Sequence, residues 1–249
     1  EEEFNENNVV YKLIKKDKIV EIIESPKAEG EINISKFSKH ETINIASNSF
    51  SKSLITIFQI NNETNINFST KSFANCETLK SIMIQTTKSV HISVNNFNEI
   101  PNLESISIKS AQLIIEDNCF NNICFTEHKS GTNNENKIIQ IESEEISIGN
   151  NCFNQLNHID EIELIGKNIN IKDNCFGECE CLSSFNINKN DYLSLGKNEF
   201  KACQNLSELQ LISNQITLGD QCFSISKLTK IEINCEEINI YNGCFSKLS

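Results

Sequence analysis

The chain has no tryptophan, one methionine, two prolines and eight glycines among 249 residues. So few prolines and glycines leave no stretch with the composition of a linker, which predicts one domain. The sequence has no apolar run of about 18 residues and therefore predicts no membrane-spanning helix. Its start, Glu1-Glu2-Glu3, lacks an initiator methionine and the features of a secretory signal, so we expect a trimmed N-terminus that hides the compartment.

Basic residues are also scarce: the chain has 22 lysines and arginines but 34 aspartates and glutamates. The formal charge of −12 and the pI of about 4.9 argue against a nucleic-acid partner, which needs clustered positive charge. No phosphate loop, dinucleotide fingerprint or nucleophile elbow is present. The histidines do not fall at metal-ligand spacing, and His91 alternates outward between two apolar residues. We therefore predict no enzymatic activity, no cofactor and no metal.

Phenylalanine recurs at nearly constant spacing along most of the chain. All but one of the intervals are 22 to 24 residues, and the exception, from Phe120 to Phe153, is 33, which fits a local insertion of about ten residues. Self-similarity at this period predicts a solenoid. The repeating residues are Phe50, Phe73, Phe97, Phe120, Phe153, Phe176, Phe200, Phe223 and Phe245.

Each repeat carries two stretches in which apolar and polar residues alternate. Before Phe176 these are Ile169 and Ile171, and after it Phe185 and Ile187. A period of two predicts strands. The apolar side chains of one repeat cannot offset the entropy of ordering its backbone, so the repeats must stack and share a core. We expect the phenylalanines to form one interior column.

The pattern Leu-x-x-Ile-x-Ile, followed by Ile-x-Ile-x-x-x-x-Phe-x-x-Cys-x-x-Leu, is best seen in Leu182–Leu206 and Ile66–Ile84. It resembles the BspA-like leucine-rich repeat family over nearly the whole chain. The resemblance implies a curved, β-rich leucine-rich repeat solenoid of about nine coils, of a type found in surface proteins of bacteria and protists. It also implies adhesion or protein binding. The chain departs from the family where cysteine often replaces the alanine before the phenylalanine.

The first 42 residues do not follow the repeat. Val9–Ile14 and Ile19–Ile23 flank a turn-like Lys15–Lys18, which predicts a β-hairpin that caps the first coil, the alternative being a partly ordered tail. We thus expect a capping segment at 1–42 and the solenoid at 43–249. The array stops four residues after Phe245. We expect a longer parent protein to continue it, or a partner or oligomer to cover it, and the oligomeric state stays open.

Most of the eleven cysteines lie in the repeat register. Five precede a repeat phenylalanine and three lie where other repeats have an aliphatic residue, which predicts reduced, buried side chains. Cys124, Cys181 and Cys235 are out of register, and the group of Cys175, Cys179 and Cys181 fits no zinc pattern. The in-register cysteines are Cys119, Cys152, Cys175, Cys222 and Cys244, then Cys76, Cys179 and Cys203.

In leucine-rich repeat solenoids the first strand of each repeat lines the concave side. We therefore predict that its outward residues form a face that binds a protein or a glycan. The alternative is that these residues are only a solvated sheet surface. A polar loop at Glu127–Lys137 is either a second binding element or an inert excursion. The candidate residues are Ser81, Met83, Ser105, Ser107, Glu161, Glu163, Ser184, Asn186, Glu208, Gln210, Lys230 and Glu232.

Together these features predict a non-enzymatic binding module, an adhesin-like protein at the cell surface or outside the cell if the resemblance extends to location. The first alternative is a cytoplasmic interaction scaffold with the same surface, which the reduced-looking cysteines favour. The second is a β-solenoid carbohydrate-active enzyme, which would need clustered carboxylates on one face.

Overall fold

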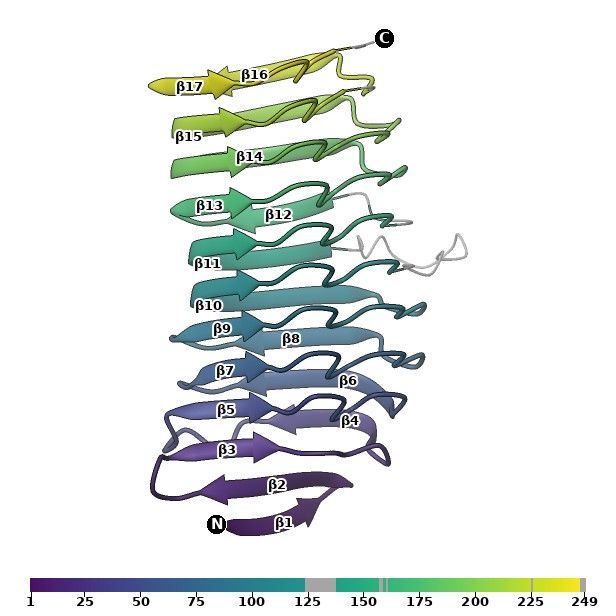
Figure 1. Ribbon diagram of the computed structural model, residues 1–249, viewed down its shortest axis with the longest axis vertical. Helices are drawn as coiled ribbons and strands as arrows, with labels where there is room; N and C mark the ends of the chain where they lie inside the picture. The colour runs from purple at the N-terminus through teal and green to yellow at the C-terminus, as the bar shows by residue number, and fades with distance from the viewer. Residues whose placement is uncertain (124–137, 157–158, 160, 225, 247–249) are drawn as a thin grey trace, which may run out of the picture.

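The structure is a computed structural model that describes residues 1–123, 138–156, 159, 161–224 and 226–246, apart from the side chains of residues 138 and 161. In this part of the chain all regular structure is β-strand, joined into one 17-stranded sheet. The coils stack along a single axis from the N-terminal strands to the C-terminal ones (Figure 1). The loop expected at Glu127–Lys137 lies outside the described residues.

The sheet wraps into two parallel ladders, which we call face 1 and face 2 (Figure 1). Face 1 contains β4 (Glu29–Ile34), β6 (Leu54–Asn61), β8 (Ser81–Gln85), the first parts of β10 (Ser105–Ile115) and β11 (Ile138–Ile148), β12 (Glu161–Ile165), the first parts of β14 (Ser184–Leu195) and β15 (Glu208–Leu218), and β16 (Lys230–Asn234). Face 2 contains β3 (Ile19–Ile22), β5 (Thr42–Ile45), β7 (Asn65–Phe68), β9 (Ser89–Ile92), the second parts of β10 and β11, β13 (Asn168–Ile171), the second parts of β14 and β15, and β17 (Glu237–Ile240).

The two strands predicted for each repeat are confirmed, with one refinement. In β10, β11, β14 and β15 they form a single strand of 11 or 12 residues that passes from face 1 to face 2. Parallel register places the alternating apolar residues of successive coils above one another, as for Ile82 and Ile106. Both side chains are buried, so the period of two does place one side of each strand in the core.

The repeat phenylalanines form one continuous stack, as predicted, and we call this stack the aromatic column. Neighbouring ring centroids lie 4.6 to 5.8 Å apart from Phe50 to Phe245. All but Phe245 are fully buried. The insertion before β11 does not interrupt the column, because Phe120 and Phe153 stack at 4.9 Å.

The turns that carry the phenylalanines contain residues in the left-handed backbone region. An asparagine usually occupies the position two residues before the phenylalanine, with a positive φ of 59° at Asn174 and 56° at Asn198. Asparagine tolerates this conformation better than most residues, which explains its recurrence at this position. These turns are also hydrogen-bonded between coils, as where the Phe200 amide donates to the Cys222 carbonyl at 2.8 Å.

The expected hairpin at the N-terminal end is confirmed. β1 (Glu2–Glu6) pairs antiparallel with β2 (Val9–Ile14), and β2 with β3. Phe4, Tyr11 and Phe37 cover the first coil, with the Lys36 ammonium 5.0 to 5.5 Å from their ring centroids. Parallel stacking already begins where β3 pairs with β5 and β4 with β6, so a coil of the stack precedes residue 43.

The last described coil is much more exposed than the first. Every residue of β17 is exposed, and Ile238 and Ile240 keep 39% and 51% of their accessible surface. Tyr241, which follows β17, is 58% exposed. The two ends of the stack therefore differ in how well their apolar side chains are covered.

Candidate functional site

The residues predicted for the binding face lie in two in-register rows on the outer side of face 1. Ser81 pairs with Ser105, and Met83 with Ser107, in adjacent coils. Toward the C-terminal end the rows continue through Ser184, Glu208 and Lys230, and through Glu163, Asn186, Gln210 and Glu232. Glu161 belongs to β12, and its side chain lies outside the description. We call this surface the acidic face.

Side chains on the acidic face bond to those of the next coil. The Gln140 amide donates to Glu163 at 2.8 Å, and the Gln210 amide donates to Glu232 at the same distance. The Lys230 ammonium lies 3.2 Å from the Glu208 carboxylate. Exposed pairs of this kind contribute only ~0–1 kcal/mol each, so their main effect is to orient the carboxylates.

The sequence analysis missed several members of this surface, and Gln59 and Gln140 are among them. Gln59 and Gln140 extend the second row, because Gln59 pairs with Met83 and Gln140 with Glu163. With Ser107 they line a hollow of about 170 Å³. Gln140 was missed because the insertion displaces its strand from the regular spacing after Phe120. The alternation of Ile139 and Ile141 was the signal that could have located it.

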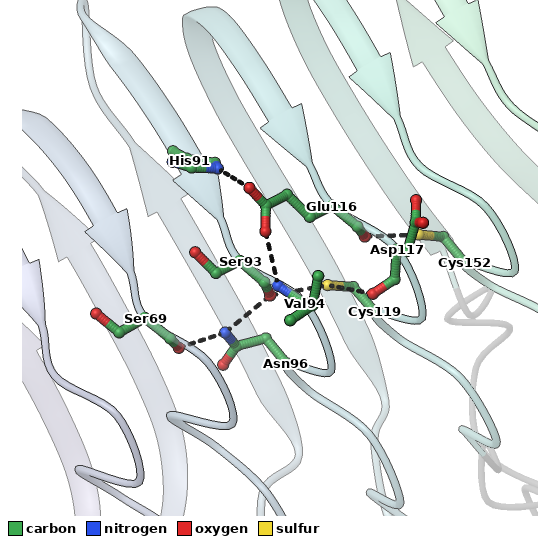
Figure 2. A network of polar contacts seen from close by, with 9 residues as sticks. All are labelled: Ser69, His91, Ser93, Val94, Asn96, Glu116, Asp117, Cys119 and Cys152. Atoms are coloured by element: carbon green, nitrogen blue, oxygen red, sulfur yellow. Dashed lines mark hydrogen bonds and ion pairs between the residues drawn. The ribbon is translucent and has the colours of Figure 1, made fainter.

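A second interior column runs beside the aromatic one, formed by the residue before each repeat phenylalanine. We call it the polar column. Most of its side chains bond to main-chain carbonyls: the Asn96 amide donates to the Ser69 carbonyl at 2.6 Å, and the Cys119 and Cys152 thiols lie 3.1 Å from the Ser93 and Glu116 carbonyls (Figure 2). The column contains Ser49, Ser72, Asn96, Cys119, Cys152, Cys175, Glu199, Cys222 and Cys244.

The predicted core positions of the in-register cysteines are confirmed, since all eight are at most 2% exposed. Burial raises the pKa of the Cys76 thiol to about 11, and it also raises the pKa values of Cys119, Cys175 and Cys222 well above the ordinary value of a thiol. A thiol held in its neutral form is a poor nucleophile and a poor metal ligand. These cysteines therefore act as packing groups and weak hydrogen-bond donors. Cys124 lies outside the described residues.

Glu199 is the one carboxyl group of the polar column, and the sequence analysis missed it. Its side chain is fully buried, and one carboxyl oxygen accepts a hydrogen bond from the Cys175 amide at 3.0 Å. The other oxygen has no hydrogen-bond partner among the described residues. Burial, and then repulsion from Asp173, raise the pKa of Glu199 well above its ordinary value. The repeat register could have identified it, because Glu199 occupies a position that is usually cysteine.

The histidines show no catalytic arrangement in the described part of the chain. His91 lies on the outer side of face 2, as predicted, and its Nε2 lies 2.9 Å from Glu116. The other oxygen of Glu116 accepts the Val94 amide at 3.1 Å, so this carboxylate fixes a turn (Figure 2). Among the described residues no three His, Cys, Asp or Glu side chains gather as a metal site would require. Nor does this part contain a helix able to cross a membrane.

Comparison with known proteins identifies the repeat. The family model described as BspA type leucine rich repeat region matches residues 11–127 and 130–249, in six copies. One similar solved structure is that of a leucine rich cell surface protein from Faecalibacterium prausnitzii A2-165, which is 11% identical in sequence. The match covers 94% of this chain and 77% of that chain, with a TM-score of 0.32. The comparison with curated proteins gives no match. The chain, whose repeat register holds across the stack, belongs to the BspA-type leucine-rich repeat family.

Proposed function

We propose that this protein is a non-enzymatic binding module that recognises a protein or glycan partner through the acidic face. The observation that carries the proposal is the pair of in-register rows, in which outward side chains repeat at each coil on a rigid sheet. Successive strands lie about 4.8 Å apart, so a partner meets groups at fixed intervals. Such a surface requires little ordering when a ligand binds.

The chemistry of the face favours a partner with positively charged groups. Glu208 and Glu232 lie on neighbouring coils of the C-terminal half, and Glu163 lies two coils before Glu208. Lys230 pairs with only one of these acids, Glu208. Carboxylates arranged in this way guide a basic surface to the correct register. The N-terminal half supplies uncharged contacts at Ser81, Ser105 and Met83, and the hollow beside Met83 is also lined by the paired charges of Lys109 and Glu142.

Family membership supports an adhesin-like role at the cell surface. An intracellular scaffold would use the same face, and localisation of the full-length parent protein distinguishes the two. Turnover of a polysaccharide by the purified chain would instead support the carbohydrate-active enzyme class and contradict a pure binding role.

The binding face is tested by charge reversal. In a pull-down from cell extracts, the triple variant Glu163→Lys, Glu208→Lys, Glu232→Lys should recover at least about fivefold less of the bound partner than wild type. The matched control reverses Glu77, Glu178 and Glu180, which are exposed acids in the turns, and changes the net charge equally. Equal losses in both variants would mean that overall charge, and not the acidic face, determines binding.

A further inference from the structure

A third row of outward side chains runs along the edge of the acidic face, where face 1 turns toward face 2. Most of its members are hydrophilic, but the member from β12 is Ile165, which pairs with Glu142 and keeps 46% of its surface exposed. Its side chain lies on the same side of β12 as that of Glu163, two residues earlier. The row contains Asn61, Gln85, Lys109, Glu142, Ile165, Asn188, Ile212 and Asn234.

A hollow of about 720 Å³ opens at the corner beside Ile165, and we call it the corner hollow. It extends along the stack from Thr86 and Thr87, before β9, to Lys189 in β14. Its surface is mainly apolar, because Ile165, Ala111 and the aliphatic stems of lysines contribute to it. A hollow of this size accommodates a large apolar side chain together with its flanking main chain.

Two irregularities of the backbone lie beside the corner hollow. Gly166 occupies the corner position that Ser143 has in the preceding coil, and a β-carbon at Gly166 would lie 2.7 Å from the Ser143 carbonyl oxygen. In the next coil the pairing of β14 with β15 shifts between Ile187 and Asn190, so β14 carries a bulge. Lys189, within this bulge, has a positive φ of 60°. The corner hollow thus lies between a missing side chain and a displaced one, and bulges are common beside binding sites.

The charges around the corner hollow largely cancel. The Lys109 ammonium lies 2.8 Å from Glu142, and the Lys167 ammonium lies 3.6 Å from an aspartate of the next coil. Lys189 and Glu144 add one charge of each sign to the lining. Such a balanced rim does not select a charged ligand, whereas a half-exposed isoleucine gains free energy when an apolar group covers it.

The corner hollow is continuous with the acidic face. Lys109 and Glu142 line both the corner hollow and the smaller hollow of the acidic face. Glu163 lies two residues before Ile165, about 7 Å away along the strand. Glu232 follows three coils later in the row of Glu163, about 14 Å further along the stack. An extended segment of about six residues therefore spans the hollow and both carboxylates.

We propose that the partner of the acidic face is a protein, which inserts one apolar side chain into the corner hollow while its basic groups contact Glu163 and Glu232. This inference rests on the proposed function and narrows its partner from a protein or glycan to a protein. Protein interfaces combine an apolar anchor in a pocket with a polar rim of complementary charge. A neutral or acidic glycan offers neither the apolar side chain nor the basic groups. A second copy of this chain fits less well, because its net charge of −12 opposes that of the acidic face.

The test begins with a random peptide library displayed on phage and selected on the full chain. We expect enriched peptides to combine one apolar residue with at least two lysines or arginines within about six positions. Synthetic copies of these peptides should bind the variant Ile165→Gln at least about tenfold more weakly than wild type. Glutamine already occupies this row at Gln85, so the variant keeps the fold.

A second variant fills the corner hollow instead of changing the isoleucine. Ala111→Asn introduces the residue that Asn214 supplies at the same corner position, and should weaken peptide binding at least about threefold. The matched control is Ile114→Ser, which removes an isoleucine that is 38% exposed on face 2, outside the hollow. Ser147 occupies the same position in the next coil, so binding should stay within about twofold of wild type.

The triple charge reversal separates this inference from the proposed function. Peptides that require the three acidic residues but bind Ile165→Gln as tightly as wild type would overturn the inference and leave the acidic face as the binding surface. Peptides that require Ile165 but bind the charge-reversal variant normally would show that the hollow and the acidic face serve different partners, which would also overturn it. The same holds if no peptide is enriched, if glycans bind in place of peptides, or if wild type is a dimer that Ile165→Gln dissociates.

Discussion

Each turn of the solenoid directs two consecutive residues into the interior, one into the aromatic column and one into the polar column. The aromatic column is phenylalanine in every repeat, whereas the polar column contains serine, asparagine, cysteine and glutamate. Each ring must contact the rings above and below at 4.6 to 5.8 Å, which fixes its shape. Each polar side chain needs only to hydrogen-bond the nearby main chain, and several residue types can do so.

In the interior of this protein, packing in the aromatic column therefore constrains the identity of a residue more strongly than hydrogen bonding in the polar column does. The comparison also identifies Glu199 as the exception within the polar column. A carboxylate there would be a buried charge next to Asp173, so the folded protein favours the protonated form of Glu199 and its pKa is raised well above the ordinary value. Three experiments test this difference between the columns, in order of decreasing expected effect.

The largest effect should come from truncation in the aromatic column. Phe176→Ala removes a fully buried ring that stacks on Phe153 and Phe200, and should lower the free energy of unfolding by ~3–5 kcal/mol in urea titrations. Phe245→Ala is the matched control at the last coil, where the ring is only partly buried, and should cost less than ~2 kcal/mol. A loss below ~1 kcal/mol for Phe176→Ala would show that the column does not support the core.

The second effect is the pH dependence of stability that Glu199 introduces. Its pKa is near 4.5 in the unfolded chain and well above that in the folded protein, so the folded state binds an additional proton between the two values. The contribution of this group is therefore complete below pH 4.5. It falls by up to ~1.4 kcal/mol per pH unit as the pH rises toward the folded pKa.

Glu199→Gln keeps the shape of the side chain and removes its titration. Urea titrations from pH 5 to 9 should show the variant gaining stability relative to wild type as the pH rises, with the exposed Glu144→Gln as control. A constant difference between the two proteins across this range would show that Glu199 does not titrate in the folded state.

The smallest effect should come from exchanges within the polar column. Cys152→Ser supplies a hydroxyl, as at Ser49 and Ser72, and should change the free energy of unfolding by less than ~1 kcal/mol. Cys152→Val fills a similar volume without a donor to the Glu116 carbonyl, and should cost more, ~1–2 kcal/mol. If valine were tolerated as well as serine, the hydrogen bond would have no measurable role.

Sequence reasoning identified the repeat, the strands, the buried cysteines and most of the acidic face from register alone. It missed Gln140, because the insertion after Phe120 moves the strand of Gln140 away from the regular spacing. It missed Glu199, because the position before the repeat phenylalanine was interpreted only in the repeats where it is cysteine. The bulge in β14 was not predicted, because the alternating apolar residues on both sides of it follow the repeat.

The sequence by itself determined the period, the inward and outward side of each strand and the content of both interior columns, because these depend on local alternation repeated at a fixed spacing. The tertiary structure alone decided which coils share a continuous strand, which side chains of neighbouring coils bond and where the corners become hollow. These features arise from contacts between residues more than 20 positions apart, such as Gln140 with Glu163. One-residue differences between coils, like the bulge at Lys189, change such contacts without altering the repeat itself.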